Sequence, residues 1–147
     1  MQTKQIVIAV VLIIVIIVAW YGYKEYNRKN VDLSTTKPDY AIDALSLIGA
    51  FEKDSAASNK KYTDKIIAVN GNIKKIDAEE NPVILFLGDA GQMSSVQCSM
   101  DSSHVAEYKT LKEGTSVTIK GLCTGYEFQD LLGTDVKLTR SVIENKK

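Results

Sequence analysis

Hydrophobic residues are distributed unevenly along the chain. Residues 6–23 form an uninterrupted apolar stretch, IVIAVVLIIVIIVAWYGY, without a charged side chain. A helix that is apolar on every side is typical of a lipid environment, where backbone groups must pair internally. At ~1.5 Å per residue, a helix over these 18 residues spans about 27 Å, close to the ~30 Å core of a bilayer. We therefore expect a membrane-spanning helix at 6–23, preceded by a short tail, residues 1–5.

The C-terminal end of this stretch indicates that the helix is an uncleaved anchor. Trp20 and Tyr21 stand where a signal peptidase requires small residues, and Lys24, Arg28 and Lys29 follow. The orientation is ambiguous at this point. The basic flank favours a cytoplasmic C-terminal side, whereas an N-terminal anchor before a compact domain is typical of bacterial export.

After the anchor, the pattern predicts a polar stalk at 24–38 and an amphipathic helix at 39–58. Pro38 suits the first turn of that helix. Its apolar stripe, expected to pack on the domain, consists of Tyr40, Ala44, Leu47, Ile48 and Phe51.

From residue 60 onward the apolar period changes from 3.6 to 2, which indicates strands. The predicted strands are 67–73, 83–87, 95–100, 116–124 and 135–143, with a short helix at 104–111 between the third and fourth. This order predicts an all-β fold, a five-stranded OB-fold barrel with a minor helix, at 60–147. A mixed sheet with the helix packed on one face is the alternative. Gly71 in the middle of the first strand indicates a bulge or bend where that strand passes between sheets.

Several short motifs within 39–143 resemble those of the tRNA_anti-like family, small bacterial OB-fold domains that often follow a membrane segment or lipoprotein signal. The matching residues are 59–62 (NKKY), 67–73 (IAVNGNI), 96–98 (VQC), 111–114 (LKEG) and 117–125 (VTIKGLCTG). The resemblance implies the fold rather than an activity, since these motifs are structural and the family name refers to similarity with anticodon-binding domains.

Charge and composition narrow the possible functions. The chain is neutral, but residues 1–38 carry a net charge of +3 and residues 39–147 a net charge of −3. An acidic domain disfavours nucleic acid, because that affinity comes largely from clustered Lys and Arg. The single His, His104, and the lack of a nucleophile or phosphate-loop motif predict no catalytic residues, no metal site, no cofactor and no enzymatic activity.

The two cysteines indicate in which cellular compartment the domain lies. Alternation along the third and fourth strands points Cys98 and Cys123 into the barrel, near the ends of their strands. We expect them to form a disulfide, although two free buried thiols are the alternative. A disulfide requires an oxidising compartment, so we expect an extracytoplasmic domain on a single-pass protein of the bacterial cytoplasmic membrane.

OB-folds bind ligands on the face of their second and third strands and on the flanking loops. The corresponding candidates here are Phe86, Gln97, Ser99, Tyr126, Glu127 and Phe128. Ile84 and Phe86 could instead pack under the helix at 39–58. Because acidic residues such as Glu79, Glu80 and Asp130 flank the face, we expect a membrane-anchored binding or assembly module that recognises a protein, peptide or glycan. The alternative is an OB domain that binds single-stranded nucleic acid on the cytoplasmic face.

Overall fold

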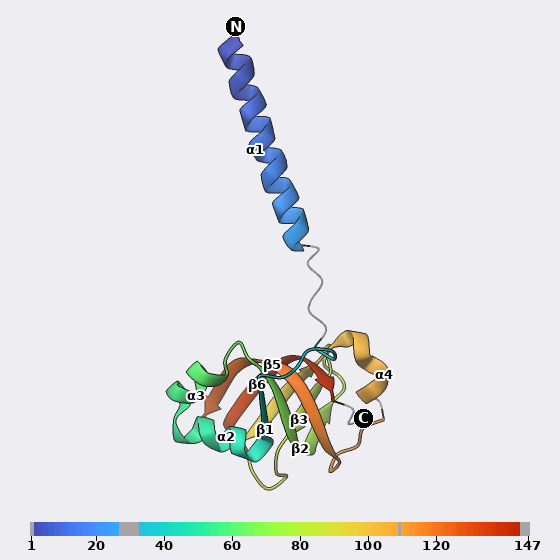
Figure 1. Ribbon diagram of the computed structural model, residues 1–147. Helices are drawn as coiled ribbons and strands as arrows, with labels where there is room; N and C mark the ends of the chain where they lie inside the picture. Colours follow the sequence, from blue (N-terminus) through green and yellow to red (C-terminus); the bar gives the residue numbers. More distant parts are fainter. Residues whose placement is uncertain (1, 27–32, 109, 145–147) are drawn as a thin grey trace. The chain divides into compact units, whose positions relative to one another are not determined.

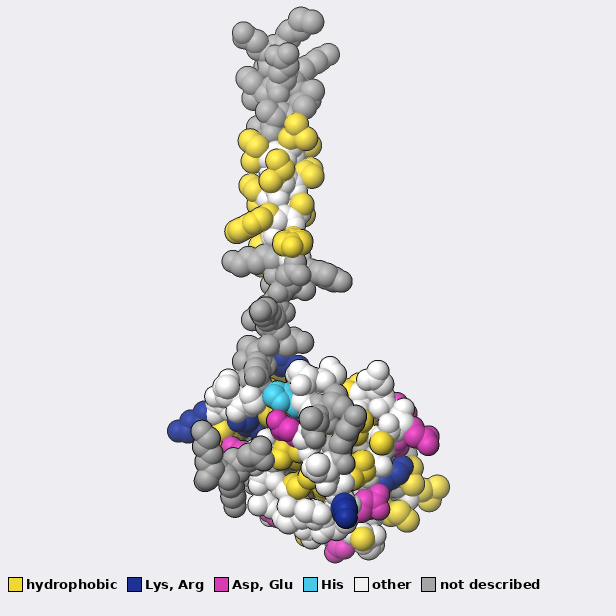
Figure 2. All heavy atoms as spheres, turned by 90° about the vertical axis from the view of Figure 1, so that its right-hand side faces the viewer, with side chains coloured by type: hydrophobic (Ala, Val, Ile, Leu, Met, Phe, Trp, Pro, Cys, Tyr) yellow, Lys and Arg dark blue, Asp and Glu magenta, His cyan; other side chains and the backbone are white. Residues whose placement is uncertain are grey.

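The computed structural model describes residues 2–26, 33–108 and 110–144. The chain divides into two units, Met1–Val31 and Asp32–Lys147. Unit 1 contains one helix, α1 (Gln2–Tyr26). The large hydrophobic side chains described along it, between Val11 and Tyr23, are all more than half exposed, and hydrophobic atoms line both flanks of the helix in Figure 2.

Among the residues that the structure describes, no helix is both long and apolar enough to cross a membrane. The anchor at 6–23 is not confirmed and stays a prediction.

Unit 2 is an OB-fold with a closed five-stranded barrel (Figure 1). Its strands are β2 (Ile66–Asp77), β3 (Ile84–Leu87), β4 (Ser95–Met100), β5 (Ser116–Gln129) and β6 (Gly133–Ile143). The first half of β2 pairs with β5 and the second half with β3, then β3 pairs with β4, and β6 lies between β4 and β5. All these pairings are antiparallel except β4 with β6. The predicted fold class and strand order are confirmed.

A sixth strand, β1 (Tyr40–Asp43), precedes the barrel and was not expected. It pairs in parallel with residues 67–70 of β2, on the stretch of that strand that β3 does not cover. Asp39 fixes the start of this pairing, since its N–H donates to Ile66 O (2.7 Å) and its carboxylate accepts from Ile66 N (2.9 Å). Tyr40 is therefore in a strand and not in the first turn of a helix.

The helix predicted over 39–58 is two helices, α2 (Ala44–Lys53) and α3 (Ser55–Tyr62). Asp43 caps α2 by accepting from Leu45 N (3.0 Å). Asp54 both ends α2 and caps α3, because its own N–H donates to Ala50 O and its side chain accepts from Ala57 N. These local side-chain contacts compete with helical pairing, which explains the break.

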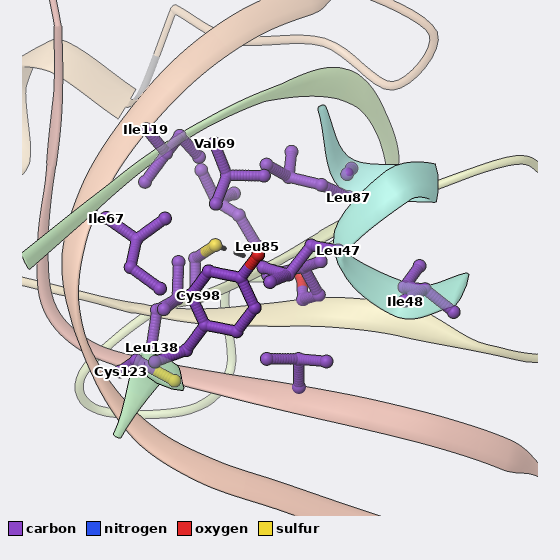
Figure 3. Packing of buried hydrophobic residues seen from close by; sticks show 14 of the residues in the cluster. Leu47, Ile48, Ile67, Val69, Leu85, Leu87, Cys98, Ile119, Cys123 and Leu138 are labelled. Carbon is purple, nitrogen blue, oxygen red and sulfur yellow. Dashed lines mark hydrogen bonds between the residues drawn. The ribbon is translucent and has the colours of Figure 1, made fainter. Parts of the chain in front are cut away.

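The expected apolar stripe is otherwise confirmed. Ala44, Leu47, Ile48 and Phe51 are buried and join the inward residues of the strands in one core. Figure 3 shows Leu47 beside Leu85 and Leu87. At the other side of the core, η1 (Ser102–His104) and α4 (Val105–Tyr108) replace the predicted helix at 104–111, and Tyr108 is buried.

Part of the predicted stalk belongs to the domain. Leu33 is 2% exposed, and the buried Lys120 of β5 donates from Nζ to Ser34 O (3.1 Å) and Thr36 O (2.7 Å). We call residues 33–38 the strap. Residues 27–32 of the predicted stalk lie outside the described residues.

Candidate ligand-binding surface

One row of side chains runs across four neighbouring strands on the outside of the barrel. Register places Lys75 of β2 beside Phe86 of β3, Phe86 beside Gln97 of β4, and Gln97 beside Lys137 of β6. A second row continues this surface with Asp77, Ile84 and Ser99. We call these residues, together with Glu127 of β5, the outer face. Phe86, Ile84, Gln97 and Ser99 are half-buried, so a bound ligand could contact both apolar and amide groups.

The two lysines of the outer face are each held by a carboxylate. Lys75 Nζ lies 3.3 Å from Asp77 Oδ2 and 5.6 Å from the centre of the Phe86 ring. Lys137 Nζ forms an ion pair with Glu127 Oε2. The hydrogen bond that Lys137 donates lowers the pKa of Glu127, so this carboxylate stays ionised below the usual range of a glutamate. The outer face is therefore close to neutral.

The structure separates the six predicted site residues into two groups. Phe86, Gln97, Ser99 and Glu127 meet on the outer face. Tyr126 and Phe128 lie on the opposite side of their strand, because they pair with the buried Val136 and Thr134.

These two aromatics also lie in a strand and not in the expected loop at 125–134, since β5 continues to Gln129. We did not predict from the sequence that Lys75 and Lys137 belong to the outer face. Extending the strand alternation over residues 74–77 and 135–137 would have placed both lysines on it.

Tyr126 and Phe128 line a cavity of about 380 Å³ that sequence reasoning did not anticipate. We call it the hairpin pocket; its other lining residues are Phe51, Glu52, Ser55 and Thr134. It lies between the helical segment α2–α3 and the β5–β6 hairpin. The rings of Phe51 and Tyr126 are 5.2 Å apart.

A larger hollow of about 650 Å³ lies beside the start of α2, the middle of β2 and the turn after β3. Its wall is polar, with Asn70, Asn72, Asp89 and Glu113 among the lining residues. Lys74, which also lines it, donates from Nζ to the carbonyls of Gln92 and Met93. This lysine therefore holds the β3–β4 loop.

Comparison with known families identifies the chain. The model of the family described as tRNA_anti-like matches residues 1–136. The chain belongs to the tRNA_anti-like family. No curated protein matches the chain.

Solved structures similar to this tRNA_anti-like chain include one whose TM-score exceeds 0.5. A protein from Klebsiella pneumoniae, described as a "putative nucleic acid-binding lipoprotein", is 18% identical with a TM-score of 0.54, over 71% of this chain and 91% of that one. An OBody, NL8, bound to hen egg-white lysozyme is 16% identical (TM-score 0.40), over 56% and 97% of the two chains. Asparaginyl-tRNA synthetase from Entamoeba histolytica is 18% identical (TM-score 0.39), over 57% and 21%.

The two cysteines of this tRNA_anti-like domain are free thiols, and the expected disulfide is not formed. Cys98 of β4 and Cys123 of β5 both pair with Leu138 of β6, which lies between them. Two strands that flank a third are about 9–10 Å apart, whereas a disulfide needs Cα atoms within about 7 Å. Figure 3 shows the two sulfurs at separate positions in the core. Burial raises the pKa of both thiols.

His104 has a local structural partner. Its Nδ1 lies 3.2 Å from Glu107 Oε1. Within the described part of the chain, no group of three or more His, Cys, Asp or Glu side chains is placed to hold a metal ion. In Figure 2, charged side chains of both signs are scattered over the face that carries His104, without a continuous basic patch.

Proposed function

We propose that this chain is a non-catalytic binding module, held at the bacterial cytoplasmic membrane by its N-terminal helix, whose outer face binds a protein, peptide or glycan. The observation that carries the proposal is the pairing of both outer-face lysines with carboxylates, Lys75 with Asp77 and Lys137 with Glu127. A face of this kind offers an aromatic ring and amide groups at nearly neutral charge. Such a surface suits an uncharged polar chain better than a polyphosphate.

Single-stranded nucleic acid is the second candidate ligand. The observation that favours it is Phe86 with Lys75 over its ring, since aromatic rings and cations together are what single-strand binders use. The Klebsiella protein of the same fold also carries the description "putative nucleic acid-binding lipoprotein". Against this candidate stand the domain's charge of −3 and the two paired lysines.

Photocrosslinking in cells distinguishes the two candidates. A benzoylphenylalanine replaces Phe86 in the full chain, and the matched control carries it in place of Leu45, which is 45% exposed on α2. We expect adducts with a protein or glycan at position 86 and none at position 45. Adducts at position 86 that nuclease removes would overturn the proposal in favour of nucleic acid. Equal adducts at both positions would also contradict it.

The membrane location is part of the proposal and rests on the uncharged stretch at 6–23 and on the exposed apolar side chains of α1. We place the domain on the extracytoplasmic side, because an apolar segment directly before a compact domain is typical of exported proteins. The basic residues after the segment argue for the other side, and the free thiols remove the support that a disulfide would have given. Protease added to spheroplasts tests this assignment: digestion of the domain is expected, and protection would overturn it.

A further inference from the structure

The hairpin pocket lies apart from the outer face and differs from it in chemistry. Phe51 forms a buried part of its wall, whereas Phe128 is 63% exposed at its mouth. Tyr126, whose ring is tilted by 41° against that of Phe51, forms a further aromatic wall. Aromatic rings therefore surround much of the space, and Ser55 and Thr134 add hydroxyl groups.

One acidic side chain, Glu52, is among the lining residues. Its Oε1 accepts a hydrogen bond from Ser94 Oγ (2.6 Å), and Ser94 Oγ accepts in turn from Thr134 N (3.1 Å). These bonds fix the carboxylate against the hairpin. Among the described residues, neither Glu52 nor Asp130, at the turn of the hairpin, forms an ion pair. The carboxylate that lines the pocket, Glu52, is thus not engaged in an ion pair with any described cation.

We propose that the hairpin pocket binds the cationic side chain, arginine above all, of a partner polypeptide. A guanidinium group stacks on aromatic rings and donates hydrogen bonds to carboxylates. The hairpin pocket provides both partners, namely its aromatic rings and the fixed carboxylate of Glu52. A phosphate or carboxylate ligand would instead face repulsion from Glu52 and Asp130.

The surroundings of the pocket indicate what flanks that arginine. Met93, Leu131 and Leu132 are 68%, 87% and 54% exposed on the two loops next to it. Ser94 links these loops, because it follows Met93 and bonds to Thr134 at the start of β6. Exposed apolar side chains gathered in this way are typical of protein contact sites. The occupant is therefore an arginine with apolar neighbours, in a segment of another protein.

Nuclear magnetic resonance of the full chain in detergent micelles tests the proposal with two probes. N-acetyl-arginine amide is titrated against N-acetyl-citrulline amide, which has nearly the same shape but no charge. We expect amide shifts at Glu52, Ser55 and Phe128 with the arginine probe, and at least fivefold weaker binding of the citrulline probe.

Two variants and two matched controls locate the interaction. Glu52→Gln keeps an acceptor for Ser94 and should weaken the arginine probe at least fivefold. Phe128→Leu keeps an apolar side chain without the ring and should weaken it two- to fivefold. Glu79→Gln, an exposed acidic residue of the β2–β3 loop, and Phe86→Leu, on the outer face, should leave the affinity unchanged.

Several results would overturn the proposal. Equal shifts from both probes, or unchanged arginine affinity in Glu52→Gln, would exclude charge recognition in the pocket. Shifts confined to Phe86 and Gln97 would assign the probe to the outer face. If the protein formed a dimer that Phe128→Leu dissociates, a second copy of the chain would be the occupant of this surface. If spin-labelled lipids quenched the amide signal of Leu131, the bilayer would be what covers it.

Discussion

The Cβ of Ala44, the first residue of α2, lies directly against Gly71 in the middle of β2. A Cβ placed on Gly71 would be 2.7 Å from it, a distance at which the helix or the strand must move. Gly71 is therefore the point at which α2 can approach the barrel, and this approach brings Leu47, Ile48 and Phe51 into the core.

We expect Gly71→Ala to destabilise the domain by about 1–3 kcal/mol, because it overpacks the contact between the Ala44 Cβ and the backbone of β2. Urea unfolding of the full chain in detergent, followed by near-ultraviolet circular dichroism, measures the change. Gly49→Ala is the matched control, since a Cβ at that position in α2 meets nothing within 4 Å. It should stabilise the helix by up to about 1 kcal/mol. Equal effects of the two substitutions would show that Gly71 does not set the approach of α2.

The strap is expected to depend on Lys120. Lys120→Met keeps most of the aliphatic stem but removes the hydrogen bonds to Ser34 O and Thr36 O. Charge-assisted bonds of this kind contribute about 1.5–3 kcal/mol each. We expect hydrogen exchange at the amide of Thr36 to accelerate at least tenfold, while exchange within β4 stays unchanged. Lys112→Met, at an exposed lysine, should change neither. Protection of Thr36 that survives in Lys120→Met would show that the buried Leu33 alone holds the strap.

The barrel could be predicted because each of its strands has a buried side that alternates in sequence. Ile67, Val69 and Ile73 are buried as expected, and so are Val96 and Cys98. The bend is close to the position expected: β2 changes partner from β5 to β3 after Asn72, and its register shift falls between Ile73 and Lys75. Gly71 itself serves the contact with Ala44 instead.

Contacts between residues distant in sequence account for what could not be predicted. Tyr40 fits a helical stripe as well as a strand, and only its pairing with Ile67 decides between them. A lysine such as Lys120 is expected to face solvent from its residue type alone. It is buried because the strap, more than 80 positions earlier in the chain, covers it. Alternation points Cys98 and Cys123 inward but does not show that β6 separates them. The hairpin pocket likewise depends on α2 and α3 meeting the extended part of β5.

The buried thiols should make stability fall at alkaline pH. Burial raises the pKa of Cys98, so its thiol stays protonated in the folded state, whereas the unfolded chain releases the proton near pH 8.5. Above that pH the unfolded state binds fewer protons, and the free energy of unfolding decreases with pH. We expect a slope of up to about 1.4 kcal/mol per pH unit from this thiol. Urea unfolding at pH 7 to 10 measures it.

Cys98→Val is the control for this prediction, because it keeps an apolar side chain at a fully buried position without a titratable group. Its free energy of unfolding should decrease less steeply above pH 8.5 than that of the natural chain. Parallel pH profiles would contradict the assignment. Ellman's reagent should also react only slowly with the folded protein. After unfolding it should detect two thiols per chain, whether or not the protein was reduced beforehand.

The paired lysines of the outer face should limit its affinity for polyanions. The double variant Asp77→Asn/Glu127→Gln releases Lys75 and Lys137, so we expect its affinity for a fluorescent dT15 oligonucleotide to rise at least tenfold at low salt. The plot of log affinity against log salt should steepen by about 0.7 for each lysine that gains a phosphate. Fluorescence anisotropy with the full chain in detergent measures both.

The control for this last prediction removes two negative charges from the β2–β3 loop instead of from the two ion pairs. Glu79→Gln/Glu80→Gln changes the net charge equally but leaves both outer-face ion pairs intact. Its affinity for dT15 should rise by less, because Lys75 and Lys137 stay paired with Asp77 and Glu127 and are not released to contact a phosphate. Similar gains in the two double variants would mean that overall charge, and not the release of Lys75 and Lys137, governs binding. Tight, salt-dependent binding by the natural chain would instead favour nucleic acid as its ligand.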